Sequence, residues 1–200
     1  RYYNGCQPDG DCWSARYQTY SDGLQTAIDE PGGLAFCNVD TATRCGNSPP
    51  VVGAIAQKYL SLGGCGSVLG APVQAEAGTP DGIGRFSVFE QGSIYWNPAH
   101  GAFEVHGTIR DEWAATGWEA GILGYPLTDE TTTPDGIGRY NVFEQGSIYW
   151  TPDTGAHEVN GRIRDAWKNA GWEAGELGYP ISDEYAVTGG RRSDFQHGSI

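Results

Sequence analysis

Residues 79–96 read TPDGIGRFSVFEQGSIYW, and residues 133–150 read TPDGIGRYNVFEQGSIYW. The match extends beyond these words, because residues 79–126 and 133–180 are identical at 35 of 48 positions without a gap. An offset of 54 residues held over this length indicates a duplicated unit. The chain is therefore expected to fold as a tandem array, and its function is expected to lie on a repeated surface.

A fainter copy precedes these two and a shortened copy follows them. The earlier copy runs from Ile55 to Pro72 at the same offset, with Cys65 where the later copies have Glu119 and Glu173. This difference predicts an adapted end cap. The last copy is two residues shorter in its first turn and stops within a repeated word, so two equivalent surfaces are expected and not three.

The hydrophobic pattern changes its period within each unit. In the second complete copy, residues 139–145 and 147–150 read as two strands around a Glu-Gln-Gly turn, and residues 156–160 read as a third strand after a Pro-Asp-Thr-Gly turn. From Ile163 onward apolar residues recur at helical spacing, until Gly171 ends the helix. Each unit is thus predicted to hold a small antiparallel β-meander and a short helix.

These elements predict an α+β repeat protein built from tandem units of about 54 residues. The repeat domain is assigned to residues 51–200, with units at about 55–108, 109–162 and 163–200. Neither the meander nor the helix can bury its aromatic face alone, so the units must stack or close into a pseudo-symmetric ring. Residues 1–50 do not match the repeat, and we expect this segment to pair with the last meander and close the structure.

All five cysteines lie in the first third of the chain, at Cys6, Cys12, Cys37, Cys45 and Cys65. Their spacing is typical of short disulfide loops and not of a zinc site. We expect Cys6 to pair with Cys12 and Cys37 with Cys45, because short loops are the easiest to close, although four cysteines allow three connectivities. Cys65 is then left over, as a buried free thiol or as a partner for an N-terminal cysteine or for another chain.

The composition excludes several classes of protein. A formal net charge of −13 repels a nucleic-acid backbone, and no run approaches the roughly 20 apolar residues that a membrane span needs. The 31 glycines and 38% hydrophobic residues indicate a turn-rich globular chain. The sequence contains no Met, and we interpret this as the mark of a processed, secreted protein.

The words Gly-Trp-Glu-Ala-Gly, Leu-Gly-Tyr-Pro and Gly-Ser-Ile-Tyr-Trp, repeated in register over about residues 55–200, resemble the LGFP repeat family. This family occurs in exported actinobacterial cell-wall proteins, including mycoloyltransferases and amidases. The resemblance implies a secreted, non-catalytic module that binds cell-wall polysaccharide, chiefly arabinogalactan, and that can accompany a catalytic domain on a longer precursor. It implies no cofactor.

Aromatic side chains are the first candidates for contact with such a glycan, because the apolar face of a sugar ring packs on an aromatic plane. Adjacent residues of a strand point to opposite faces. We therefore expect Trp96 and Trp150, in phase with Ile94 and Ile148, to lie in the core, with Tyr95 and Tyr149 facing the ligand. Trp113 and Trp167 lie on the apolar stripe of the helix and are expected in the core. Trp118 and Trp172, just past the helix end, are candidates either for the core or for contact with the ligand.

Polar candidates flank the same strands. Glu90, Gln91, Glu144 and Gln145 could bind vicinal hydroxyls, or could simply cap their turn. Asp81 and Asp135 are expected to bond their own turn backbone or an arginine such as Arg85 or Arg139. One carboxylate per loop is too few for a calcium site.

Catalysis finds little support in the sequence. The carboxylate pairs that a glycosidase needs recur in every copy and so look like scaffold, and no Ser, His and Asp set or metal triad can be assembled. The remaining alternatives to a glycan-binding module are a small secreted hydrolase built on the cysteine-rich segment, and a module that binds or inhibits another protein through exposed tyrosines.

Overall fold

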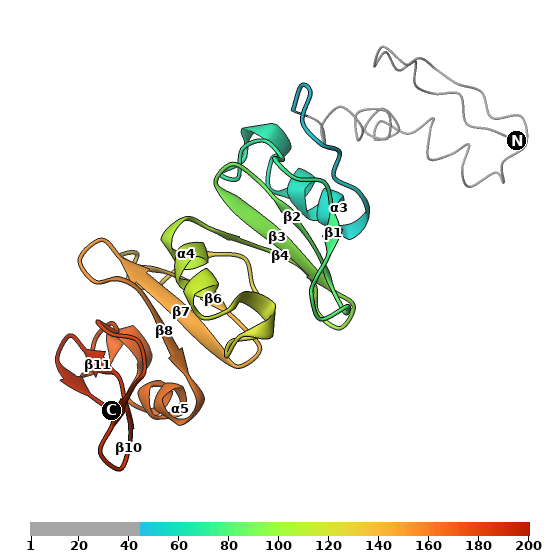
Figure 1. Ribbon diagram of the computed structural model, residues 1–200. Helices are drawn as coiled ribbons and strands as arrows, with labels where there is room; N and C mark the ends of the chain where they lie inside the picture. Colours follow the sequence, from blue (N-terminus) through green and yellow to red (C-terminus); the bar gives the residue numbers. More distant parts are fainter. Residues whose placement is uncertain (1–44) are drawn as a thin grey trace, which may run out of the picture.

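The computed structural model describes residues 45–200 as three units that follow one another along the molecule (Figure 1). The first unit begins with helix α3 (Gly53–Ser61) and the 3₁₀ turn η1 (Gly64–Gly66), followed by strands β1 (Ala77–Gly78), β2 (Arg85–Val88), β3 (Gly92–Asn97) and β4 (Gly101–His106). The second unit repeats this order with α4 (Gly107–Ala115), η2 (Trp118–Ala120), β5 (Thr131–Thr132), β6 (Arg139–Val142), β7 (Gly146–Thr151) and β8 (Gly155–Asn160). Each of these units holds one four-stranded antiparallel sheet in sequence order.

The third unit is smaller. It begins with α5 (Gly161–Asn169) and η3 (Trp172–Ala174), and continues with two short hairpins, β9 (Tyr185–Val187) with β10 (Gly190–Arg192) and β11 (Asp194–Phe195) with β12 (Gly198–Ser199). An isolated bridge between Pro180 and Phe195 joins the Leu-Gly-Tyr-Pro bend to the last hairpin. The same bridge recurs as Pro72 with Phe89 and Pro126 with Phe143, so the third unit keeps the geometry of the complete ones.

The helix boundaries follow from local chemistry. Ile163 and Trp167, one turn apart, are the buried residues of α5, as the helical spacing predicts. The helix ends at Gly171, whose φ of 98° lies in the left-handed region that glycine adopts most readily. Gly117 ends α4 in the same way with a φ of 99°. The predicted helix and meander are confirmed in the two complete units, whereas the sequence analysis missed the two-residue strands β1 and β5 and the 3₁₀ turn after each helix.

Helices and sheets alternate along the stack. One buried cluster joins Tyr95 and Val105 of the first sheet, Ile109 and Trp113 of α4, and Ile148 of the second sheet. Helix α4 therefore packs on its own sheet and on the sheet before it, α3 packs on the first sheet, and α5 packs on the second. A sheet between two helices therefore packs against a helix on each of its faces. Trp113 and Trp167 are fully buried, so their predicted place in the core is confirmed.

The arrangement of the two sheet faces corrects the expectation for the paired aromatic residues. Tyr95 and Tyr149 are each only 6% exposed, because their side of the sheet packs against the next helix. Trp96 packs on the opposite face with Ile94, and it is only partly buried. The phase of Trp96 with Ile94 was predicted correctly, but the assignment of one face to solvent was wrong.

The sheets of the described part of the chain stay open, and the stack does not close into a ring. Stacking, the other predicted arrangement, is what the structure shows (Figure 1). The expected pairing of residues 1–44 with the last meander lies outside the described residues, as do Cys6, Cys12 and Cys37 and any disulfide between them. Within residues 45–200, no helix has the length and apolar character needed to cross a membrane.

A disulfide joins Cys45 to Cys65. The expected pairing of Cys45 with Cys37 is therefore wrong, and so is the expectation of a free thiol at Cys65. The bond connects the segment before α3 to η1, where it closes the end of the stack. The alternative that Cys65 pairs with a cysteine from the N-terminal part of the chain is the one observed.

Candidate functional site

A pocket of about 300 Å³ opens where the second sheet meets the helix of the third unit. We call it the second seam pocket, and its lining residues are Pro134, Tyr140, Val142, Tyr149, Arg164, Trp172 and Glu173. The first four belong to the sheet side of the seam and the last three to α5 and η3. The structure thus brings together Tyr149 and Trp172, two candidates that lie on different elements and in different units.

Tyr149 forms the floor of this pocket. Its ring stacks on Tyr140, with 5.0 Å between centroids, and meets Trp167 edge-on at 4.7 Å. Burial, together with the nearby charge of Glu173, raises the pKa of the Tyr149 hydroxyl, so the group stays neutral and able to donate. Within residues 45–200 this hydroxyl has no hydrogen-bond partner. A ligand that enters the pocket can therefore accept a hydrogen bond from it.

Trp172 forms a wall of the pocket from an unusual backbone position. Its φ is 58°, a left-handed conformation that is costly for a bulky residue and that tends to mark functional positions. The Arg164 guanidinium lies 5.4 Å from the centre of the indole ring and donates to the Ser147 hydroxyl. The half-buried indole is therefore held between the arginine and the pocket.

The equivalent positions of the preceding seam, 54 residues earlier, carry the same chemistry. This first seam site contains Pro80, Phe86, Val88, Tyr95, Arg110, Trp118 and Glu119. Trp118 repeats the left-handed backbone with a φ of 59°, lies 6.3 Å from Tyr95 between ring centroids, and has Arg110 at 5.0 Å. Because two separate copies keep this geometry, it belongs to the design of the repeat.

Glu119 is the most unusual group of the first seam site. The residue is 8% exposed, yet its carboxylate receives no hydrogen bond from any other described residue. Burial raises its pKa, and the charge of Asp81 raises it further. The carboxylate accepts a hydrogen bond from its own backbone N–H, and in the described part of the chain neither its oxygens nor the Tyr95 hydroxyl is both fully buried and unpaired. Both groups therefore reach solvent and can bond a ligand that enters the seam.

This arrangement has no counterpart at the start of the stack. The positions of Trp118 and Glu119 are occupied there by Gly64 and Cys65, and the disulfide to Cys45 lies where the later copies have the seam. The prediction of a modified end cap agrees with this difference. Glu119 and Glu173 were not predicted as site residues, although their place in the repeated word Gly-Trp-Glu-Ala-Gly is a signal that could have identified them.

The polar turn candidates lie elsewhere. The Glu144 side chain accepts a hydrogen bond from the Tyr125 backbone N–H at 3.1 Å, and Glu90 accepts one from Ala71 at 3.0 Å. Both side chains thus hold the Leu-Gly-x-Pro bend. Gln91 and Gln145 are exposed at the same turns, and none of these four residues lines the second seam pocket. Of the two roles predicted for the glutamates, the structure supports the capped turn.

Asp81 and Asp135 have the structural role expected from their turns. Asp135 accepts hydrogen bonds from the Thr133 hydroxyl, the Ile137 N–H and the Tyr179 hydroxyl. Burial opposes ionisation, but these hydrogen bonds outweigh it and lower the pKa of Asp135. Tyr179 belongs to the next unit, so the turn is also a lock between units.

The predicted alternative of an arginine partner for these aspartates is wrong. Arg85 pairs with Glu76, and Arg139 pairs with Glu130. Among the described residues no group of three or more His, Cys, Asp or Glu side chains is arranged to hold a metal ion.

Fold and geometry together define an open, stacked α+β repeat protein with the same site built into successive seams. The sequence model of the LGFP repeat matches residues 69–121, 123–175 and 177–200, and the chain belongs to the LGFP repeat family. LGFP repeats are a cell-wall-associated repeat type. No curated protein matches the chain at a significant level.

Proposed function

We propose that this chain is a secreted, non-catalytic module that binds cell-wall polysaccharide of the arabinogalactan type through its two seam sites. The observation that carries the proposal is the second seam pocket, where the Trp172 indole, the Glu173 carboxylate and the Tyr149 hydroxyl line one opening. Within residues 45–200 no group forms a hydrogen bond with the Tyr149 hydroxyl, so it is available to a ligand. A ligand rich in hydroxyl groups matches this set of side chains.

The chemistry of the seam suits a sugar ring. The apolar face of the ring packs on the half-buried indole of Trp118, while its hydroxyls donate to Glu119 and accept from Tyr95. The second seam offers the same set in Trp172, Glu173 and Tyr149. A pocket of about 300 Å³ is at the lower limit of ligand pockets, which are roughly 300–1,000 Å³, so each seam accommodates a small part of a polymer.

Repetition supplies the affinity that one shallow pocket lacks. After one seam holds a polysaccharide chain, engagement of the second is effectively intramolecular, and avidity rises by about 10²–10⁴ over a single site when the geometry allows both contacts. This explains why the site is duplicated instead of enlarged. Such a module would anchor itself, or a catalytic domain carried on a longer precursor, to the envelope.

A glycan array with purified arabinogalactan tests the proposal, with analysis of released products as the catalytic control. We expect retention on arabinogalactan without release of sugars, and loss of retention in the Glu119→Gln, Glu173→Gln variant. Hydrolysis of a wall polymer by the pure protein would support the hydrolase alternative. Failure to bind any glycan, with capture of a specific protein partner instead, would support the protein-binding alternative.

A further inference from the structure

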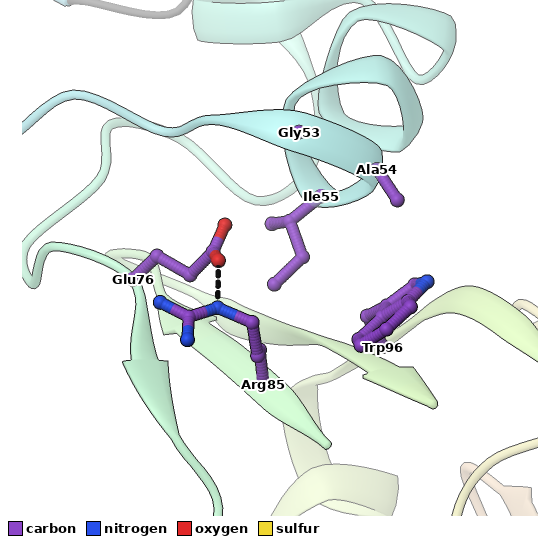
Figure 2. Close-up of a pocket in the computed structure, with 6 residues that line it drawn as sticks. All are labelled: Gly53, Ala54, Ile55, Glu76, Arg85 and Trp96. Carbon is purple, nitrogen blue, oxygen red and sulfur yellow. Dashed lines mark hydrogen bonds and ion pairs between the residues drawn. The ribbon is translucent and has the colours of Figure 1, made fainter. Parts of the chain in front are cut away.

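A second kind of pocket occurs in all three units, on the other side of each sheet from the seam. In the first unit it lies between α3 and the sheet and is lined by Gly53, Ala54, Ile55, Glu76, Arg85 and Trp96 (Figure 2). In the second unit the lining is His106, Gly107, Thr108, Ile109, Glu130, Arg139 and Trp150, and in the third it is Asn160, Gly161, Arg162, Ile163, Glu184 and Arg191. We call these the intra-unit pockets. Their recurrence at equivalent positions makes them a property of the repeat.

Each intra-unit pocket contains an ion pair with a buried acid and an exposed base. The Glu76 side chain is 10% exposed, whereas its partner Arg85 is 49% exposed. The Arg85 Nε donates to Glu76 (Figure 2). The terminal guanidinium nitrogens of Arg85 are therefore available to other acceptors. The pair is therefore neutral overall, with hydrogen-bond donors that remain open to solvent.

An indole completes the first two intra-unit pockets. Arg85 and Trp96 are directly opposite on β2 and β3, as are Arg139 and Trp150 on β6 and β7. Figure 2 shows Trp96 on one side of the hollow, with the Glu76–Arg85 pair on the other and Ile55 between them. Both tryptophans are only partly buried. This placement explains why these residues, expected in the core, leave part of a ring uncovered.

We propose that the intra-unit pockets of the first and second units are additional saccharide subsites, each taking one neutral sugar residue. The exposed indole supplies the plane for the ring, and the guanidinium donates to a hydroxyl oxygen. A neutral residue is favoured over an acidic one because Glu76 already compensates the charge of Arg85. The pocket volumes of about 180 and 240 Å³ are too small for more than a short part of a polymer.

The third unit provides an internal comparison. Its intra-unit pocket keeps the Glu184–Arg191 pair but has no tryptophan among its lining residues. Without the stacking plane, the ion pair alone competes poorly with water for a hydroxyl group. The third pocket is therefore a much weaker subsite than the first two.

The ligand class rests on the proposed function, so the test must separate the two claims. Oligosaccharides released from arabinogalactan are titrated into the protein while the indole N–H signals are followed by ¹H–¹⁵N NMR. Trp96 and Trp150 report on the intra-unit pockets, Trp118 and Trp172 report on the seams, and Trp113 with Trp167 report on the fold. The last two indoles donate to backbone carbonyls in the core.

We expect saturable shifts at Trp96 and Trp150 as well as at the seam tryptophans. The Glu76→Gln, Arg85→Gln variant removes the ion pair without leaving a buried charge unpaired. Loss of a charged hydrogen bond should weaken the response of Trp96 about tenfold or more, while Trp150 in the same molecule responds as before and the signals of Trp113 and Trp167 stay in place.

Three outcomes would overturn the inference in different ways. Shifts confined to Trp118 and Trp172 would leave the seam proposal standing and remove the intra-unit pockets as subsites. Shifts at no tryptophan would reject both proposals. An unchanged response of Trp96 in the double variant would show that the ion pair takes no part in binding.

Discussion

Replacement of Tyr125 by phenylalanine tests how the units are locked together. The Tyr125 hydroxyl donates to the Asp81 carboxylate of the preceding unit at 2.7 Å and lies 2.9 Å from the Thr79 hydroxyl. Tyr125 is 3% exposed, so the lost bond is not replaced by a good contact with water. Thr79 keeps its bonds to Asp81 and Gly84, which limits the loss to one charged hydrogen bond.

A hydrogen bond to a charged group contributes about 1.5–3 kcal/mol. Because the Asp81 carboxylate lies at an exposed turn, we expect a loss near or below the lower end of this range, about 1–2 kcal/mol, from Tyr125→Phe. The pKa of Asp81 is lowered in the folded chain, where hydrogen bonds from Thr79, Ile83 and Tyr125 outweigh burial. A lowered pKa stabilises the fold above the ordinary pKa of Asp, and this contribution is lost as the pH falls below about 4.

The assay is urea unfolding followed by tryptophan fluorescence, at pH 7 and at about pH 3. Tyr95→Phe is the matched control, because Tyr95 is also a largely buried tyrosine but its hydroxyl has no partner among the described residues. We expect Tyr125→Phe to lower the unfolding free energy well below that of the control at pH 7, and the difference to shrink in acid. Equal stability of the two variants at pH 7 would refute the lock.

Three further changes test other parts of the stack. Burial, with the nearby charge of Asp183, raises the pKa of Glu112 to about 7, so the stability of the fold falls as the pH rises from about 5 to 7. Glu112→Gln should therefore add about 1 kcal/mol to the free energy of unfolding at pH 8 but little at pH 5. Urea unfolding curves at the two pH values check this. Gly124→Ala should cost well over 1 kcal/mol in urea unfolding, because φ is +72° and the new Cβ would lie 2.3 Å from Glu144. Cys65→Ser removes the disulfide between two cysteines 20 positions apart, and it should lower the free energy of unfolding by about 3 kcal/mol. An unchanged melting temperature in thermal unfolding would exclude a stabilising role for the disulfide.

The sequence predicted the fold better than it predicted the site, for a definite reason. The period of the hydrophobic pattern and the turn residues identify helices and strands, as at Ile163, Trp167 and Gly171. They do not show what covers each face of a sheet. The prediction for Tyr95 assumed one solvated face, but the helix of the next unit covers it.

The seam depends on contacts between residues far apart in the sequence, such as Tyr95 with Trp118, and no local pattern reveals these. Trp118 was an open alternative because nothing in the sequence indicates a left-handed tryptophan. Glu119 was overlooked because its importance lies in its place at the seam beside Trp118 and Tyr95, which only the packed structure reveals. The pairing of Cys45 with Cys65 was missed because loop length alone was used to choose between connectivities.

The most direct test of the account measures the affinity for soluble arabinogalactan by calorimetry in the wild type and in a seam variant. The variant carries Tyr95→Phe, Tyr149→Phe, Glu119→Gln and Glu173→Gln, which remove two hydroxyls and two negative charges from the seams and preserve the shape of the core. The account predicts measurable binding by the wild type and a loss of about a hundredfold or more in the variant, since both seams lose charged hydrogen bonds and avidity disappears. Equal affinity of the two folded proteins would contradict it.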